Sequence, residues 1–376
     1  MSKWMGVEIM KYLIAGGGTG GHIYPALAIA WKIKNKDPKA EILYVGTEKG
    51  LESELVPREG LDFKTIRVMG MPRKISLGSF KAMKELLLGL LDANRIIKEF
   101  KPHIVIGTGG YVCGPVVYIA AKKKIPTLIH EQNAFPGITN KILARYVDRI
   151  LVTFEESKKY FKNPEKIILT GNPIREDILK VDKNRAYKDL NINPNIPLIL
   201  SFGGSGGQKK LNDAMFDVIK ENIPNKNIQI IHITGKRFYD DFMNKLKKER
   251  LNIGSNIRIM PYFYEMPKGL NIADLVITSA GAITLAEISA IGVASILIPK
   301  GYTAENHQEY NARTFEKNKA SYVILEKDLT GKKLNSTIKK LIRDRDKLRE
   351  MANRSKTLGK VDATERIVAI IEELIG

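Results

Sequence analysis

A glycine-rich segment between a predicted strand and a predicted helix constrains the fold more than any other feature of the chain. Residues 14–22 read Ile-Ala-Gly-Gly-Gly-Thr-Gly-Gly-His. The run 8–15 predicts a short buried strand, and apolar residues recur at helical spacing after the glycines. Glycines at such a turn let the backbone approach a ligand, and the first N–H groups of a helix attract anions. The segment therefore predicts an α/β unit of the nucleotide-binding type.

A further glycine-rich segment, later in the chain, predicts a second α/β unit of the same kind. Residues 203–207, Gly-Gly-Ser-Gly-Gly, follow an apolar strand predicted over 198–202. Strand and helix patterns alternate around both loops, which favours parallel sheets with crossover helices. The 376 residues are enough for two domains with well-filled cores. We expect two Rossmann-like domains facing each other across a cleft, with the polar run 182–197 as the linker into the second.

The chain is strongly basic, with 61 Lys and Arg against 41 Asp and Glu and a net charge of +20. Such a charge favours an anionic partner, which can be nucleic acid, an acidic membrane or a phosphorylated substrate. The lysines are spread along the chain, without zinc-finger spacing, an RNA-binding aromatic motif or a basic-region helix. We therefore expect no nucleic acid partner. One cysteine, Cys113, excludes an internal disulfide, and no apolar run reaches the ~18 residues of a membrane span.

The segment 69–91 mixes apolar side chains with the basic residues Arg73, Lys74, Lys81 and Lys84. A basic, apolar surface segment can lie on an anionic bilayer. The same pattern is also typical of a loop followed by a helix that buries its apolar side and leaves its lysines in solvent. The residues alone leave both interpretations open for the loop and favour the core-facing interpretation for the buried face of the helix.

Two enzyme classes with glycine-rich phosphate loops fit the chain poorly. The acidic residue that would hold an adenosine ribose is absent after the second predicted strand, where the chain reads Tyr-Val-Gly-Thr over 44–47. This disfavours a nicotinamide-dependent oxidoreductase. No Gly-Lys-Ser/Thr follows the first glycines, so the loop is not a P-loop.

Metal binding is not expected either. The histidines show no ligand spacing with one another or with Cys113. Asp344 and Asp346 could hold a metal–diphosphate, but their lysine- and arginine-rich surroundings favour a solvated helix face. We therefore predict no metal and no cofactor.

A few polar residues stand where chemistry is expected. His22 closes the first glycine loop and has an ordinary pKa of about 6.5, which suits a general base; it could equally cap the loop. Glu131 lies where a predicted strand over 127–130 ends, the edge at which open sheets bind ligands. Small residues at 279–284 open a helix after another strand, and Glu287 follows one turn later. That glutamate could accept hydrogen bonds from a ribose or simply lie on the surface.

Taken together and in order, these segments resemble one family. The matching runs are residues 17–22, 107–111, 130–133, 171–175, 203–205, 279–287, 307–308 and 311–312. They resemble the MurG family, the UDP-N-acetylglucosamine:undecaprenyl-diphospho-muramoyl-pentapeptide N-acetylglucosaminyltransferases of peptidoglycan synthesis. The resemblance implies a GT-B fold with two Rossmann-like domains. We expect an N-terminal domain over 1–172 joined by a C-terminal helix over 360–376, and a UDP-GlcNAc-binding domain over 173–359.

The resemblance also implies the reaction. GlcNAc would pass from UDP-GlcNAc to the C4 hydroxyl of N-acetylmuramic acid in lipid I, with inversion and without a metal, to give lipid II. Because lipid I is membrane-borne, the protein would work as a peripheral protein on the cytoplasmic side of the cell membrane. The anionic inner-membrane surface would then be a partner of the basic chain.

Site residues are implied residue by residue. His22 would take the proton of the acceptor hydroxyl, with Glu131 as the rival base. Glu287 would bind the ribose, Phe263 would offer backbone to uracil, and Gln308 would reach the sugar. The remaining substrate contacts would come from Thr19, Gly20, Gly21, Asn133, Arg175, Ser205, Ala282, Ile283, Thr284, Leu285 and Ala286. The family commonly has glutamine where this chain has Gly206, so no donor contact is expected there.

Two alternatives from other classes remain. A UDP-GlcNAc 2-epimerase shares the fold, but it would need acidic groups for proton abstraction and no acceptor. A basic protein without enzymatic activity would bind nucleic acid or membrane in a salt-dependent way.

Overall fold

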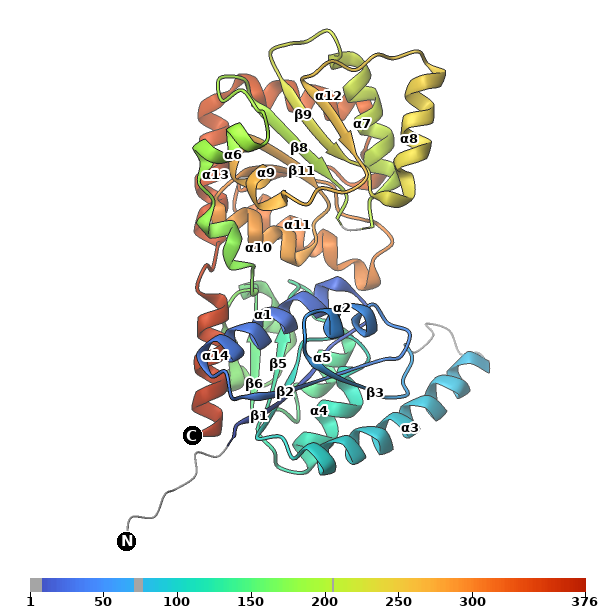
Figure 1. Cartoon of the computed structure of the whole chain (residues 1–376), viewed down its shortest axis with the longest axis vertical. Coiled ribbons are helices and arrows are strands. Elements are labelled where there is room, and N and C mark those ends of the chain that lie inside the picture. Colours follow the sequence, from blue (N-terminus) through green and yellow to red (C-terminus); the bar gives the residue numbers. More distant parts are fainter. Residues whose placement is uncertain (1–8, 71–76, 205) are drawn as a thin grey trace. The chain divides into compact units, whose positions relative to one another are not determined.

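The computed structural model describes residues 9–70, 77–204 and 206–376 (Figure 1). The chain forms two compact units, one from residues up to 174 together with 361–376 and one from residues 175–360. The divisions expected from the sequence were after 172 and after 359. The run 182–197 is not the linker we predicted, because it lies inside the second unit and contains a helix.

The described residues of the first unit form a parallel sheet of seven strands in the order β3-β2-β1-β4-β5-β6-β7. Its strands are β1 (Lys11–Ala15), β2 (Glu41–Gly46), β3 (Asp62–Thr65), β4 (Ile104–Gly107), β5 (Thr127–Glu131), β6 (Arg149–Val152) and β7 (Ile167–Leu169). The order of pairing reverses between β1 and β4. Such a switch point is where open α/β sheets bind ligands, at the carboxyl ends of the strands.

Helices cover both faces of this sheet. They are α1 (Gly20–Lys36), α2 (Glu52–Arg58), α3 (Leu77–Phe100), α4 (Cys113–Lys122), α5 (Ile138–Leu143) and α14 (Ala363–Ile375), with the short 3-10 helices η1 (Glu155–Tyr160) and η2 (Pro164–Lys166). Helices α3, α4 and α5 bury apolar side chains against one face, and α1 and α14 against the other.

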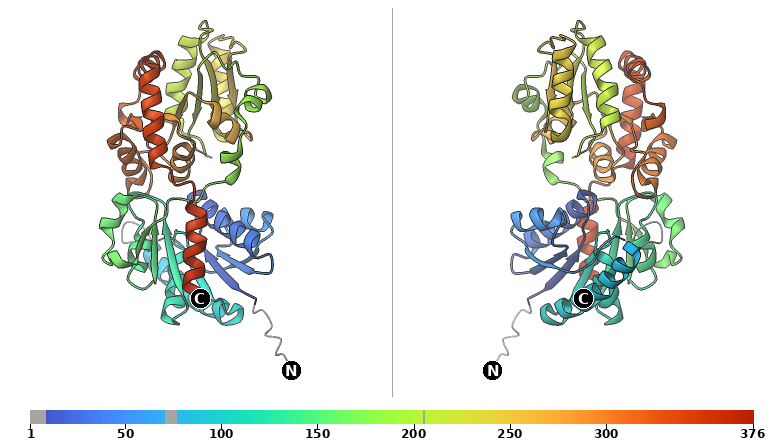
Figure 2. Two further views of the ribbon diagram at one scale, coloured as in Figure 1. Left: turned by 90° about the vertical axis from the view of Figure 1, so that its left-hand side faces the viewer. Right: turned by 90° about the vertical axis from the view of Figure 1, so that its right-hand side faces the viewer.

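The last helix, α14, therefore completes the unit with which the chain begins (Figure 2). Ile367 and Ile371 of α14 are fully buried in the core that α1 shares. Ion pairs at 2.6 Å join Lys32 to Glu365 and Lys36 to Glu372 at the edge of this contact.

The described residues of the second unit form a parallel sheet of six strands in the order β10-β9-β8-β11-β12-β13. Its strands are β8 (Leu198–Phe202), β9 (Gln229–Ile233), β10 (Ile257–Met260), β11 (Leu275–Thr278), β12 (Ala294–Leu297) and β13 (Ser321–Val323). The order repeats that of the first unit, and the switch point lies between β8 and β11. The predicted pair of Rossmann-like domains is thus confirmed.

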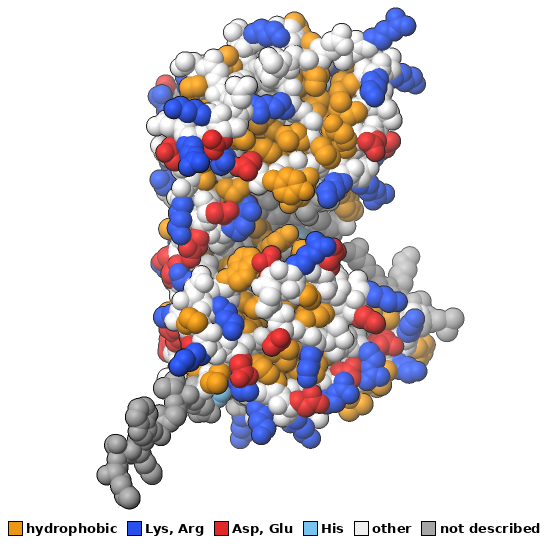
Figure 3. All heavy atoms as spheres, in the orientation of Figure 1, with side chains coloured by type: hydrophobic (Ala, Val, Ile, Leu, Met, Phe, Trp, Pro, Cys, Tyr) orange, Lys and Arg blue, Asp and Glu red, His pale blue; other side chains and the backbone are white. Residues whose placement is uncertain are grey.

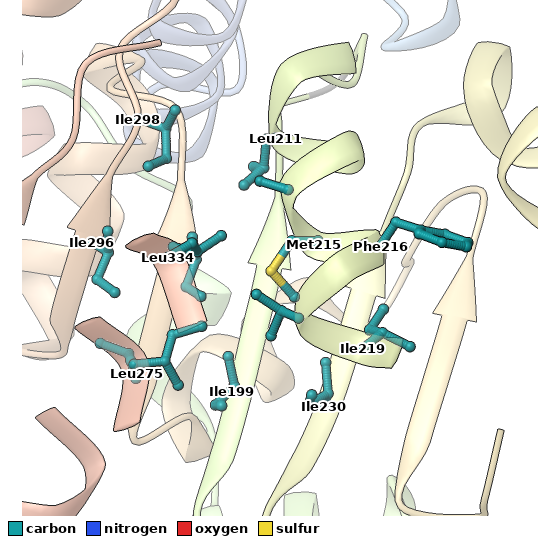
Figure 4. Close-up of a cluster of buried hydrophobic side chains, with 14 of the residues drawn as sticks. Ile199, Leu211, Met215, Phe216, Ile219, Ile230, Leu275, Ile296, Ile298 and Leu334 are labelled. Atoms are coloured by element: carbon teal, nitrogen blue, oxygen red, sulfur yellow. The ribbon is translucent and has the colours of Figure 1, made fainter. Parts of the chain in front are cut away.

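The second sheet is also covered by helices on both faces. They are η3 (Glu176–Lys180), α6 (Lys183–Asp189), α7 (Lys209–Asn222), α8 (Lys236–Lys248), α9 (Met266–Ile272), α10 (Ala282–Ile291), η4 (Ala304–Asn306), α11 (His307–Lys317), η5 (Glu326–Asp328), α12 (Gly331–Arg343) and α13 (Arg345–Leu358). Leu211 and Met215 of α7 pack on Ile199 and Ile230 of the sheet, which Figure 4 shows. This core fixes the strand ends that carry the ligand-facing loops.

Candidate functional site

Two glycine-rich loops meet at the switch point of the first sheet. The first glycine loop (residues 16–21) follows β1, and the second glycine loop (residues 108–111) follows β4. The N–H of Gly17 donates to the carbonyl of Gly109 at 3.3 Å. The register of β1 with β4 brings the loops together, since Ala15 lies opposite Gly107.

Only glycine fits where the second glycine loop touches His22. Gly109 and Gly110 have φ of +110° and +82°, which other residues rarely adopt. A Cβ on Gly109 would lie 2.7 Å from Cδ2 of His22, and one on Gly110 would lie 2.3 Å from the carbonyl oxygen of Gly17. The two glycines therefore leave the space that the imidazole occupies.

The geometry of His22 selects one tautomer. Its Nδ1 lies 2.9 Å from the carbonyl oxygen of Gly17, which can only accept, so Nδ1 carries the proton and Nε2 is left as an acceptor. Burial lowers the pKa of His22 below its ordinary value, although the bond to Gly17 and the Glu52 carboxylate act in the opposite direction. A neutral imidazole with a free Nε2 is the form that a general base requires. Thr19, Gly20 and Gly21 lie beside it, at the start of α1.

Glu52 is a site residue that the sequence reasoning missed. Its side chain is fully buried beneath the first glycine loop. One carboxylate oxygen accepts from the N–H of Gly18 at 3.0 Å, and the other accepts from the N–H and hydroxyl of Thr47 at 3.0 and 2.8 Å. Glu52 thus ties the first glycine loop to the end of β2. The only signal in the sequence was an acidic residue shortly after the Thr47–Gly50 turn. Such a residue looks like an ordinary glutamate in the first turn of a helix.

Cys113 forms hydrogen bonds where the ends of β1 and β4 lie side by side. Its Sγ lies 2.9 Å from the carbonyl oxygen of Ala15 and accepts from the N–H of Gly109 at 3.0 Å. Burial raises the pKa of the Cys113 thiol to about 12, so it stays protonated. The thiol joins the end of β1 to the second glycine loop rather than acting as a nucleophile.

Glu131, the rival base, is almost fully buried at the end of β5. Its Oε1 accepts from the N–H and side-chain amide of Asn133, at 2.9 and 3.2 Å. Its Oε2 accepts from the N–H of Gly137 and the amide of Asn140, at 3.1 and 2.8 Å. Burial raises the pKa of Glu131 while these hydrogen bonds oppose the rise. The carboxylate therefore shapes the turn that presents Asn133.

The switch point of the second sheet carries the third glycine loop, residues 203–207 after β8. The predicted donor contact Ser205 lies outside the described residues. Gly207 has a φ of +71°, and a Cβ there would lie 2.3 Å from the carbonyl oxygen of Thr234. Gly206 has open space around the position of a Cβ. Buried Ser279 follows β11 and reaches the same loop, with Oγ 3.4 Å from the position of a Cβ on Gly204.

Arg175 and Glu287, which the sequence expected in one site, lie together. Nε of Arg175 is 3.5 Å from a carboxylate oxygen of Glu287, and 3.9 Å from one of Asp177. Burial raises the pKa of Glu287 to about 7, although Arg175 opposes the rise. Contacts between η3 and α10 hold the pair in place.

The side chains in the first turns of helix α10 differ in how deeply they are buried. The side chains of Ala282 and Leu285 are buried, whereas those of Ile283, Thr284 and Ala286 are half-buried. The N–H of Leu285 donates to the carbonyl of Gly281 at 2.9 Å, so neither this N–H nor the buried side chain is open to a ligand in this structure.

Two further predicted contact residues, Phe263 and Gln308, are buried and contact neighbouring residues. Phe263 is buried, and a Cβ on Gly269 would lie 2.5 Å from its ring, so its side chain is packed inside the unit. Gln308 is buried at the start of α11, and its Oε1 accepts from the N–H of Lys300 at 3.0 Å. The side chain of Lys300 in turn bonds to Gly207 of the third glycine loop.

The two aspartates considered above as ligands of a metal–diphosphate, Asp344 and Asp346, are exposed to solvent. Asp344 caps α13 by accepting from the N–H of Lys347 at 2.9 Å, and Asp346 is exposed. Within the described ranges, no group of three or more His, Cys, Asp or Glu side chains is arranged to hold a metal ion.

Family comparisons cover both units. Residues 12–152 match the Glycosyltransferase family 28 N-terminal domain, and residues 198–367 match the Glycosyltransferase family 28 C-terminal domain. These ranges contain the first, second and third glycine loops.

Curated relatives match along nearly the whole chain. The UDP-N-acetylglucosamine--N-acetylmuramyl-(pentapeptide) pyrophosphoryl-undecaprenol N-acetylglucosamine transferase of Thermoanaerobacter sp. (strain X514) is 54% identical over 365 residues, which cover 97% of this chain and 100% of the relative. The transferase of the same name from Clostridioides difficile (strain 630) is 52% identical, over 96% of this chain and 88% of the relative.

Solved structures agree on the architecture. The crystal structure of Acinetobacter baumannii MurG has a TM-score of 0.77 and 28% identity, and the match covers 97% of this chain and 99% of that one. The UDP-GlcNAc 2-epimerase from Neisseria meningitidis bound to UDP-GlcNAc has a TM-score of 0.66 over 97% of this chain and 100% of that one, but at 14% identity it shares the fold alone. With about half of its residues identical to those of the curated relatives, the chain belongs to glycosyltransferase family 28 and, within it, to the MurG family with its GT-B fold.

Proposed function

We propose that the chain transfers GlcNAc from UDP-GlcNAc to the C4 hydroxyl of N-acetylmuramic acid in lipid I, and so forms lipid II for peptidoglycan synthesis. It is a hexosyltransferase, and the identity of over 50% to transferases named for this reaction supports the assignment. The single structural observation that carries it is the imidazole of His22, whose Nδ1 is held by Gly17 and whose Nε2 is an acceptor.

His22 is the general base of this proposal. Nε2 takes the proton of the acceptor hydroxyl while its oxygen bonds to the anomeric carbon of GlcNAc. The bond from that carbon to the β-phosphate oxygen breaks, and UDP leaves with the electron pair. Attack from the face opposite the leaving group inverts the anomeric centre. The oxygens of Glu131 already accept four hydrogen bonds, which supports His22 in preference to Glu131.

The second unit binds the donor in this proposal. Glu287 accepts from the ribose hydroxyls, backbone near Phe263 meets the uracil, and the start of α10 and Arg175 stabilise the negative charge of the leaving UDP. Gln308 and Asn133 contact the sugar side. Thr19, Gly20 and Gly21 offer the start of α1 to phosphate or sugar.

The acceptor is lipid-borne, so the protein works at a membrane surface, and α3 supports this. Phe80, Met83, Leu87 and Leu91 form one stripe along α3 and are 75%, 49%, 57% and 64% exposed. Lys81 and Lys84 flank the stripe, and Figure 3 shows basic, acidic and hydrophobic side chains mixed in the region of this helix. Arg73 and Lys74, which the sequence analysis added to the segment, lie outside the described residues.

The opposite side of α3 is a core-facing surface. Ala93, Ile96 and Ile97 are buried against the sheet, so this side of the helix fits the core-facing interpretation of the sequence. None of the helices in the described part of the chain has the length and apolar character needed to cross a membrane. We infer a peripheral protein that rests on the anionic cytoplasmic surface of the cell membrane through α3.

A transfer assay tests the function. The protein is incubated with labelled UDP-GlcNAc and a short-chain analogue of lipid I. We expect label in a disaccharide product only when the acceptor is present, together with stoichiometric UDP. Formation of the manno epimer without acceptor would instead establish the epimerase, and neither product would refute both.

A further inference from the structure

The ammonium group of Lys300 lies at the third glycine loop and has no part in the mechanism proposed above. Lys300 follows β12 at the carboxyl edge of the second sheet and is half-buried. Its Nζ donates to the carbonyl oxygen of Gly207 at 2.9 Å. It also lies 3.9 Å from the position that a Cβ on Gly204 would occupy. The cation is thus fixed beside glycine backbone at the switch point.

No carboxylate neutralises this cation. Glu326 is the acidic group whose charge acts on Lys300. Its Oε1 accepts from the amide of Gln208 at 2.9 Å, and its Oε2 accepts from the N–H of Gly301 at 3.0 Å. Among the residues that the structure describes, none forms an ion pair with Lys300. A partly desolvated ammonium with one neutral partner has donors left for an anion.

The space beside Lys300 suits a phosphate. Ser279 Oγ lies 3.4 Å from the same Cβ position on Gly204, so a hydroxyl and an ammonium flank one stretch of glycine backbone. Apart from its chain neighbours, no described residue has an atom within 4 Å of a Cβ built on Gly206, so no side chain from elsewhere in the described residues fills that position. Glycine backbone, a hydroxyl and a lysine are the groups that bind phosphate oxygens in proteins.

We propose that Lys300 binds the diphosphate of the UDP-sugar at the third glycine loop and neutralises the charge that develops on UDP as it leaves. This inference rests on the proposed function and adds a residue to it. As the bond from the anomeric carbon to the phosphate oxygen breaks, that oxygen keeps the electron pair, and a fixed cation nearby stabilises the product side. Burial lowers the pKa of Lys300 below its ordinary value, and a bound diphosphate would favour the charged form.

Nucleotide titrations on the full chain test the inference. Wild type, Lys300→Met, Lys300→Arg and the control Lys317→Met, an exposed lysine on α11, are titrated with UDP and with uridine. We expect Lys300→Met to bind UDP about tenfold to a hundredfold more weakly, because a charge-assisted bond to phosphate is lost, and to bind uridine as wild type does. Lys300→Arg and Lys317→Met should keep UDP affinity within about threefold of wild type.

Each other outcome has a definite meaning. Equal UDP affinity in wild type and Lys300→Met would overturn the role of Lys300 and leave the proposed function intact. Parallel loss of UDP and uridine would show that Lys300 only props the loop through Gly207, which also overturns the inference. Wild type that binds no UDP would refute the proposed function itself. Circular dichroism and thermal unfolding of each variant confirm that the compared proteins are folded.

Discussion

At the scale of single residues, the backbone rather than a carboxylate sets the state of His22. The carbonyl of Gly17 accepts from Nδ1, and burial favours the neutral ring. In many hydrolases an aspartate plays this orienting part and stabilises an imidazolium. Here the nearest acid, Glu52, bonds to the loop and not to the ring. The arrangement suits a base that accepts one proton and returns it to solvent after transfer.

The first prediction concerns pH. Burial lowers the pKa of His22 below its ordinary value, so the ring is neutral near pH 7 and becomes protonated as the pH falls through that lowered pKa. Turnover should therefore be constant near neutrality and decline only on the acid side. His22→Ala should reduce turnover about a hundredfold or more and remove this acid limb, while UDP affinity is kept. An unchanged profile in His22→Ala would exclude His22 as the base.

Glu52→Gln should weaken the first glycine loop. The amide offers one oxygen, which can face the two donors of Thr47, and its NH2 group would then meet the N–H of Gly18. A donor facing a donor should cost about 1–3 kcal/mol of stability, and turnover should fall because the carbonyl of Gly17 is displaced. Glu54→Gln, an exposed position on the same helix, is the matched control. Denaturant unfolding and steady-state turnover measure both effects, and identical behaviour of the two variants would contradict the prediction.

Glu287 gives a second pH dependence. Burial raises its pKa to about 7 in the free protein. If the ionised carboxylate accepts from ribose hydroxyls, ligand binding favours deprotonation, and affinity should rise as the pH increases through about 7. Uridine is the suitable probe because it has no phosphate that titrates in this range. Affinity for uridine should become independent of pH in Glu287→Gln, with Arg175 and Asp177 left in place. A pH dependence that survives this substitution would assign it to another group.

Site residues differ in how far the sequence could reveal them. His22 and Glu287 follow a glycine loop and a strand end, and local patterns mark such positions. Glu52 is separated from Gly18 by 34 residues, and their contact exists only once α2 packs beneath the first glycine loop. Lys300 likewise meets Gly207 across 93 residues. Partners brought together by tertiary packing leave no spacing signal in a single sequence.

At the scale of elements, strong periodic segments were predicted well and weak ones were not. The strand β8 has the predicted bounds, 198–202, because its apolar run is short, uniform and flanked by polar turns. The three-residue edge strand β13 was missed, since it is too short for a period to be visible. Helix α6 was taken for linker because its polar composition hides it, although Asp182 caps it by accepting from the N–H groups of Asn184 and Arg185.

Helix α14 allows a test of how the first unit is completed. Ile371 is fully buried, so Ile371→Ala should remove about 2–5 kcal/mol from the stability of that unit. Val361, which is exposed just before the helix, provides the control Val361→Ala. Trp31 lies on α1 of the first unit, so a change in its fluorescence reports the unfolding of that unit. A denaturant midpoint that does not move in Ile371→Ala would contradict the packing of α14.

At the scale of the whole molecule, charge and the α3 stripe should act together at a membrane. With a net charge of +20, binding to anionic vesicles should weaken as salt increases, because counter-ions screen the attraction. Leu87→Gln should reduce vesicle binding about tenfold at every salt concentration, since one apolar side chain no longer enters the bilayer. Leu179→Gln, an exposed leucine of the second unit, is the control. Sedimentation with vesicles measures the bound fraction. Binding that is independent of the salt concentration and unchanged in Leu87→Gln would refute the membrane role of α3.

The return of α14 to the first unit has a consequence for biosynthesis. On the ribosome, residues 175–360 are made before the helix that completes the first unit. At about 5–20 residues per second, the nascent chain waits roughly 10–40 seconds with the α14-binding side of that core uncovered. The second unit can finish folding during this interval, which reverses the usual order in which the N-terminal part matures first. The uncovered apolar face is where we expect a chaperone to engage the newborn protein.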